Sequence, residues 1–128
     1  KLETADHSVY FNMFTFTNDR ISKKLTELKN RGIKIRGTVE VFQTGSTYSR
    51  FSNLRENKVP VRKDNFDGVL HDKYAVIDGG SPNSNPTVVT GSFNWTFSAN
   101  YSNDENLISL QDATIASHYY KDARDIFR

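Results

Sequence analysis

The first part of the chain changes from one hydrophobic period to another. Residues 9–16 are rich in aromatic side chains and predict a strand. Residues 18–31 then place apolar side chains at helical spacing, with Asn18 suited to cap the helix and Gly32 suited to end it. Residues 33–41 alternate between apolar and polar side chains, which predicts a half-buried strand.

The rest of the chain begins with an irregular stretch. Residues 43–66 hold no sustained period and are rich in Ser, Asn, Thr and charge, which indicates a long loop. Apolar residues over 69–77 and at 88–89 then predict two buried strands that end in polar residues. A short strand over 107–110 and a helix capped by Asp112 follow. The expected apolar face of this last helix consists of Ile115, Tyr119, Ala123 and Ile126.

This order of elements predicts an α/β domain with a mixed sheet. The chain has 128 residues, which is room for one domain and one core over residues 1–128. No stretch approaches the roughly 20 apolar residues that span a bilayer. The absence of cysteine excludes disulfides and thiolate metal sites. It fits a bacterial periplasmic or secreted protein, but many cytosolic domains also lack cysteine, so the location stays open.

Polar residues that could carry out chemistry lie within the first of these predicted strands and directly after the second. His71 and Lys73 are two positions apart, so on a strand their side chains share a face. We expect Ser92 and Asn94 to share a face in the same way. Two such strands side by side would gather one nucleophile and several hydrogen-bond donors around a single phosphate. For a lone histidine, a buried structural role would be the better interpretation, and Gly-Ser-x-Asn alone would be an ordinary turn.

The combination of these residues resembles a known family. The segments HDKYAVID at 71–78, GSFNW at 91–95 and NDEN at 103–106 match the pattern H-x-K-x4-D, G-S-x-N of the phospholipase D superfamily. The similarity runs from about Tyr10 to the C-terminus, in particular to small bacterial single-motif endonucleases. It implies an α/β/α sandwich, a mixed sheet flanked by helices on both faces, with one copy of the motif. It also implies that the chain is an excerpt from a longer protein.

The spacing between the two motif segments departs from the family. Twelve residues separate Asp78 from Gly91, whereas the family usually has about half a dozen. The additional residues, within 79–86, are mostly turn formers. We expect a lengthened hairpin loop at the far end of the two strands, which leaves the site intact.

The motif residues have expected roles in phosphodiester hydrolysis. His71 would attack phosphorus and form a phosphohistidine that water then hydrolyses. Lys73, Asn94 and Ser92 would stabilise the negative charge that grows on the phosphoryl oxygens. No metal and no cofactor is needed, because the lysine already supplies positive charge. Asp78, the last candidate of the first segment, is expected to tie the strand end to backbone donors rather than to carry a proton.

The resemblance adds two further expectations. It implies that Glu105 orients the imidazole of His71, although an exposed acid in a polar loop is the competing interpretation. It also implies that a second copy of the motif supplies the general acid, from a homodimer mate or from elsewhere in a longer chain. His7 and His118 lack the surroundings of the motif and are expected to be surface or helix-face residues.

The substrate depends on local features, since the net charge is only +2. Lys58, Arg62 and Lys63 precede the motif and would hold a polyanion backbone, and Trp95 would stack on unpaired bases. Solvated surface cations and a core aromatic are the competing interpretation. The sequence therefore predicts a metal-independent phosphodiesterase, first of all a nuclease acting on DNA or RNA. A phospholipase D acting on phospholipid head groups and a non-catalytic phosphate-binding or nucleic-acid-binding module are the alternatives.

Overall fold

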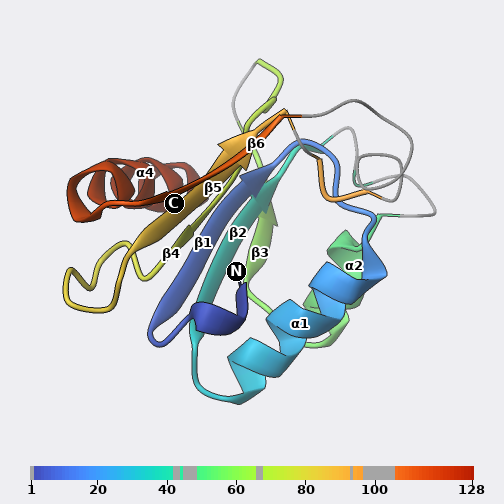
Figure 1. Ribbon diagram of the computed structural model, residues 1–128. Helices are drawn as coiled ribbons and strands as arrows, with labels where there is room; N and C mark the ends of the chain where they lie inside the picture. The colour runs from blue at the N-terminus through green and yellow to red at the C-terminus, as the bar shows by residue number, and fades with distance from the viewer. Residues whose placement is uncertain (1, 42–43, 45–48, 66–67, 93, 97–105) are drawn as a thin grey trace.

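A six-stranded mixed sheet forms the centre of the molecule, and helices cover both of its faces (Figure 1). The computed structural model describes residues 2–41, 44, 49–65, 68–92, 94–96 and 106–128. The expected α/β class, with helices on both faces of a mixed sheet, is confirmed. Within the described part of the chain, no helix has the length and apolar character needed to cross a membrane.

The strands lie in the order β3-β2-β1-β4-β5-β6. The first three strands in the chain run parallel to one another, and β4, β5 and β6 each pair antiparallel with a neighbour. In chain order the elements are η1 (Leu2–Thr4), β1 (Ser8–Met13), α1 (Asp19–Asn30), β2 (Lys34–Val39), α2 (Phe51–Glu56), β3 (Val61–Lys63), β4 (Lys73–Ile77), β5 (Thr87–Gly91), β6 (Leu107–Gln111) and α4 (Ala113–Phe127).

Each face of the sheet has its own hydrophobic core. Alternate residues of β1 divide between them, because successive strand side chains point to opposite faces. Val9 and Phe11 pack with α1 and α2 in the larger core, whereas Tyr10 packs with α4 in the smaller one. The face opposite α1 is therefore covered as well, and the second half of β2, residues 37–39, is buried on both sides, whereas Lys34 is exposed and Arg36 half-buried. This differs from the half-buried strand that its alternating pattern predicted.

Both long helices begin where their caps predicted. The side chain of Asn18 accepts a hydrogen bond from the N–H of Ile21 at 3.0 Å, and Asp112 does the same for Ile115 at 2.9 Å. The face of α4 differs from the expected one. The residues that pack on the sheet are Ala116, Tyr119, Tyr120 and Ala123. Ile115, expected on this face, is instead exposed in the first turn of the helix.

The stretch expected to be a loop contains two short elements. Helix α2 and strand β3 both lie within residues 43–66. A helix of six residues and a strand of three are too short to produce a recognisable hydrophobic period. They are held instead by tertiary contacts, since Leu54 and Val61 are fully buried and β3 pairs with β2.

One end of the sheet carries the motif. Met13 pairs with Val39 on one side and with Lys73 on the other, and Gly91 ends β5 at the same end. We call this the motif end of the sheet. The connection between β4 and β5 lies at the opposite end, as the lengthened hairpin predicted (Figure 1).

Candidate active site

His71 and Lys73 are in direct contact at the motif end. The Nζ atom of Lys73 lies 2.8 Å from Nδ1 and 3.2 Å from Nε2 of His71, and it donates to the carbonyl oxygen of His71 at 2.8 Å. An ammonium group has donors but no acceptor. In this contact a ring nitrogen can take part only as the acceptor, which a neutral imidazole permits. A neutral imidazole is the form that can act as a nucleophile.

Phe14 supports this pair from the end of β1. Its ring centroid lies 4.7 Å from that of His71, and the Nζ of Lys73 lies 5.2 Å from the centroid of the same ring. The backbone N–H of Phe14 also donates to the carbonyl oxygen of Asp72 at 2.9 Å. Sequence reasoning missed this residue. Its contact depends on β1 lying beside β4, which no local pattern in the sequence specifies.

Asn94 is fixed by the residue that follows Phe14. The backbone N–H of Thr15 donates to Oδ1 of Asn94 at 3.1 Å. The carbonyl oxygen of the side chain is thus used by the protein, and its amide group is the part with hydrogen atoms to donate to a ligand. Because Phe14 and Thr15 are consecutive, one short segment contacts both His71 and Asn94. The structure therefore brings both halves of the motif to the same end of the sheet.

Ser92 and Gly91 connect the second motif segment to β6. The hydroxyl of Ser92 accepts from the N–H of Asn106 at 2.9 Å, and the N–H of Ser92 donates to the carbonyl oxygen of Asn106 at 2.9 Å. Gly91 has a φ of +143°, and a Cβ there would lie 2.0 Å from that same carbonyl oxygen. Strand β5 ends at Gly91, so Ser92 and Asn94 lie beyond the strand and do not share one of its faces.

Asp78 lies at the other end of β4 and is a structural residue. Its buried carboxylate accepts the backbone N–H groups of Asp6 at 3.0 Å, His7 at 2.8 Å and Ser8 at 2.9 Å. Seven strand positions separate it from His71, which is roughly 20 Å in an extended chain. Its inclusion among the catalytic candidates is therefore corrected, whereas its expected backbone contacts are present. His7 lies at this far end as well. Glu105, the expected orienting residue, lies outside the described residues.

The three basic residues expected to hold a polyanion do not form one cluster. Arg62 lies over the ring of Phe127 at 4.3 Å and donates to its carbonyl oxygen at 2.8 Å. Lys63 points to the other face of the sheet, where its Nζ lies 5.4 Å from the ring of Phe51. Lys58 follows α2 with a φ of 61°. Of the three, Lys63 lies at the motif end, where it pairs with Val39.

Trp95 belongs to the core rather than to the surface. Its side chain is 8% exposed and packs against the rings of Phe11 and Phe16, with centroids 5.0 and 4.9 Å away. Its carbonyl oxygen accepts from the N–H groups of Thr17 and Asn18, both at 2.8 Å. The expectation that this indole stacks on a base is corrected by its burial.

A polar network lies behind the motif, on the α4 side of the sheet. Burial is the main cause that raises the pKa of Asp72, and the nearby charge of Asp122 raises it further. The hydroxyl of Tyr74 donates to Asp122 at 2.6 Å and accepts from Nδ2 of Asn12 at 2.8 Å. Burial also raises the pKa of Tyr74, so this phenol stays protonated. The network connects the first motif segment to α4.

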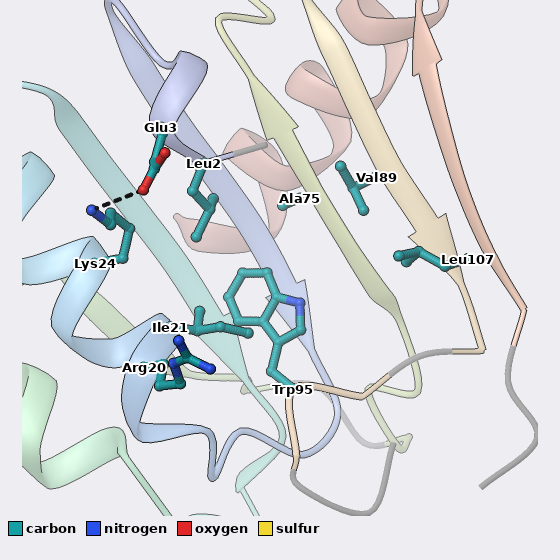
Figure 2. A pocket seen from close by; sticks show the side chains of 9 residues that line it. All are labelled: Leu2, Glu3, Arg20, Ile21, Lys24, Ala75, Val89, Trp95 and Leu107. Atoms are coloured by element: carbon teal, nitrogen blue, oxygen red, sulfur yellow. Dashed lines mark ion pairs between the residues drawn. The ribbon is translucent and has the colours of Figure 1, made fainter. Parts of the chain in front are cut away.

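A pocket of about 370 Å³ lies on the α1 face of the sheet, close to the motif end (Figure 2). Its lining includes the apolar side chains Leu2, Ile21, Ala75, Val89, Trp95 and Leu107. Arg20 and Lys24 contribute cations, and Lys24 forms an ion pair with Glu3 at 3.4 Å. Among its described lining residues there is no motif residue that could attack or bind a phosphate. Among the described residues, no group of three or more His, Asp or Glu side chains is placed to hold a metal ion.

Comparison with known proteins identifies relatives along nearly the whole chain. A protein-family model described as "Cardiolipin synthase, PLD-like domain" matches residues 1–126. A phospholipase D of Rickettsia prowazekii (strain Madrid E) is 30% identical over 119 residues, which cover 93% of this chain and 55% of that protein. A mitochondrial cardiolipin hydrolase of Xenopus laevis is 33% identical over 118 residues, which cover 92% and 53%. The chain thus spans about half the length of these curated relatives.

A solved structure of similar fold is that of Nuc from Salmonella typhimurium, described as a phospholipase D family member. Its TM-score is 0.87 at 25% identity, over 98% of this chain and 80% of that chain. The similarity covers nearly the whole of this chain, so the fold is common to both structures.

Proposed function

Because the chain belongs to the phospholipase D-like domain family, we propose that it hydrolyses phosphodiesters through His71 and that its substrate is a nucleic acid. The observation that carries the proposal is the contact of the Lys73 ammonium with the imidazole of His71 at 2.8 Å. It joins a neutral nucleophile to a cation that phosphoryl oxygens attract. Asn94, whose amide is turned to donate, lies at the same end of the sheet.

The proposed reaction has two displacements. A phosphate entering the site draws the Lys73 ammonium to its oxygens, which releases the ring nitrogen of His71. This nitrogen forms a bond to phosphorus as the bond to the leaving oxygen breaks, and the leaving oxygen takes a proton from a general acid. Water then attacks the phosphohistidine and gives a proton to the group that acted as the general acid, while the P–N bond breaks and the second product leaves. Lys73 and Asn94 stabilise the charge on the phosphoryl oxygens in both steps.

A long substrate fits the open position of the nucleophile. His71 is exposed at the motif end, and Lys63 is exposed at the same end. A polymeric phosphodiester can reach such a nucleophile without entering an enclosed cavity. Contacts to its backbone by lysine would hold it without reading its sequence.

A phospholipid is the second candidate substrate, and the pocket beside Trp95 favours it. Apolar walls suit an acyl chain, and the cation of Arg20 suits an anionic head group, whereas Lys24 is paired with Glu3 and Glu27. The names of the relatives, phospholipase D and mitochondrial cardiolipin hydrolase, also point to lipid substrates for those proteins. The non-catalytic binding module is the third candidate. It has no need of a neutral histidine beside a lysine.

The general acid is proposed to come from a second copy of the motif, in a homodimer mate or in another part of a longer chain. Large apolar side chains are exposed at the motif end, at Val69 before His71 and at Leu107 and Ile108 at the start of β6. Such exposed apolar residues support contact with another protein surface. A closed two-fold pair would place two motif histidines around one phosphate.

The testing experiment compares three substrates in EDTA: plasmid DNA, single-stranded RNA and cardiolipin vesicles. Cleavage of nucleic acid by the wild type, and its loss in His71→Ala with retained substrate binding, is the expected result. Cleavage of vesicles alone would replace the nuclease proposal by the lipid one. Binding without turnover, unchanged in His71→Ala, would support the binding module.

Activity restored only by a divalent ion would contradict the metal-free mechanism, and a fully active monomer with one motif would contradict the shared site.

A further inference from the structure

A fully buried carboxyl group lies next to the first motif segment. Glu40 follows β2 directly and is 0% exposed, although its alternating sequence pattern predicted a solvent-facing side chain. Its backbone N–H donates to the carbonyl oxygen of Met13 at 3.3 Å, which fixes it at the motif end of the sheet. A carboxyl group withdrawn from water needs hydrogen-bond partners. The identity of its partner therefore indicates what the group does.

One partner of this carboxyl group is the residue directly before the nucleophile. Oε2 of Glu40 accepts a hydrogen bond from the backbone N–H of Leu70, which is itself 2% exposed. Hydrogen bonds between backbone N–H groups and a carboxylate are among the stronger ones in proteins. The bond joins the end of β2 to the segment that enters β4.

The backbone around His71 is held by hydrogen bonds outside the strand pairing. Strand β4 begins at Lys73, so the backbone of His71 lies before the paired part of the strand. Two hydrogen bonds bracket the histidine instead. Glu40 binds the N–H of the preceding residue, Leu70, and Phe14 binds the carbonyl oxygen of the following residue, Asp72.

We propose that Glu40 is a positioning residue for the nucleophile: by holding the N–H of Leu70, it sets the position of the His71 imidazole relative to Lys73 and Asn94. This rests on the proposed role of His71 as the nucleophile. An in-line attack tolerates little displacement, and a shift of about 1 Å can reduce a rate by about 100-fold. In this proposal the effect of Glu40 on the imidazole passes through the backbone of Leu70.

Asp64 provides a matched control. It is 6% exposed and follows β3 as Glu40 follows β2. Its Oδ1 also accepts a backbone N–H, that of Val41, at 2.6 Å. The two carboxyl groups thus make the same kind of bond at neighbouring strand ends, but only that of Glu40 holds the segment before His71.

The experiment compares Glu40→Met and Glu40→Gln with Asp64→Leu and Asp64→Asn in the same chain. Methionine keeps the length of the side chain but removes the acceptor, whereas glutamine keeps an acceptor oxygen. Turnover is measured with bis(p-nitrophenyl) phosphate, whose good leaving group reduces the need for the general acid. The ring signals of His71 are followed by NMR, and Tm is recorded for each variant.

The expected result is a fall in kcat of about 10–100-fold in Glu40→Met, with KM within about 2-fold. His71 ring signals shift, and Glu40→Gln recovers most of kcat. Asp64→Leu lowers Tm by a similar amount but keeps kcat and the His71 signals. Equal losses of kcat in Glu40→Met and Asp64→Leu would overturn the proposal, as would unchanged His71 signals in Glu40→Met.

The test remains decisive if a variant does not fold or if the wild type is inactive. If Glu40→Met does not fold, Glu40→Asp takes its place, because it keeps the carboxyl group but withdraws it by one methylene. If the wild type hydrolyses no diester, the proposed function fails. The His71 signals then decide the positioning role alone, since a shift in Glu40→Met and none in Asp64→Leu supports it and the reverse contradicts it.

Discussion

The imidazole of His71 lies against the ring of Phe14, with the centroids 4.7 Å apart and the planes inclined at 44°. This contact comes from β1 and fixes one face of the proposed nucleophile. We expect Phe14→Ala to lower kcat by about 10–100-fold, because the imidazole loses the surface that limits its rotation. Steady-state hydrolysis of bis(p-nitrophenyl) phosphate measures the change. Phe14→Leu, which keeps an apolar surface, should lose less, and an unchanged kcat in Phe14→Ala would contradict the role.

Gly91 is expected to tolerate no side chain. Its φ of +143° is unfavourable for other residues, and an added Cβ would meet the carbonyl oxygen of Asn106 at 2.0 Å. Gly91→Ala should therefore lower the free energy of unfolding by about 2 kcal/mol or more. Urea denaturation measures it. Gly68→Ala is the control, since a Cβ there meets no atom within 4 Å, and equal losses in the two variants would refute the steric explanation.

Asp78 is expected to affect stability without affecting catalysis. Asp78→Ala leaves the N–H groups of Asp6, His7 and Ser8 without their acceptor and should cost about 2–4 kcal/mol. Asp78→Asn should cost less, because asparagine keeps an acceptor and tolerates the φ of 55°. Denaturation midpoints give the stabilities. The kcat of the folded variants should equal that of the wild type, and a selective loss of kcat would return Asp78 to the site.

Asp72 is expected to make the free energy of unfolding depend on pH. Burial and the charge of Asp122 raise the pKa of Asp72 in the folded state. Its contribution to stability is therefore fully present below the unfolded pKa of about 3.9 and is lost as the pH rises through the folded pKa. Asp72→Asn removes this loss. The stability of the variant relative to the wild type should therefore rise between about pH 4 and pH 7. Urea denaturation at these two pH values measures the difference in the free energy of unfolding. A difference that became smaller as the pH rose would contradict the prediction.

Trp95 is the single tryptophan of the chain and gives a direct optical test. Because it is 8% exposed among Phe11 and Phe16, its emission should be blue-shifted and poorly quenched by acrylamide. Addition of single-stranded oligonucleotide should leave the emission nearly unchanged. Strong quenching that follows binding would instead mean that a base stacks on the indole.

Local patterns were sufficient for much of the fold. Helix α1 combines a cap at Asn18 with regular apolar spacing over 12 residues, so its limits were predictable. Helix α2 and strand β3 were missed, because elements of six and three residues depend on buried contacts such as those of Leu54 and Val61. Glu40 was misjudged for a related reason. Its pattern gives one polar face to β2, but neighbouring parts of the chain bury that face.

The candidate site, too, was predictable only in part. The nearness of His71 to Lys73 was predicted from strand periodicity, and the two side chains are in contact although His71 lies just before β4. The contacts of Phe14 and Thr15 with the two motif segments depend on β1 lying beside β4, which no local pattern specifies. The predicted cluster of basic residues was wrong, and strand periodicity explains why. Arg62 and Lys63 are consecutive strand residues and therefore point to opposite faces.

The turn that connects β4 and β5 lies far from the proposed catalytic residues around the start of β4 and after the end of β5. The connecting residues 79–86 lie at the opposite end of the sheet from His71, and Pro82 and Asn83 are exposed there. Insertions and deletions in evolution can therefore accumulate at this turn while the catalytic end keeps its geometry. The same turn is a suitable place for an epitope or a fluorophore, because a label between Pro82 and Asn83 would report on the protein without entering its reaction.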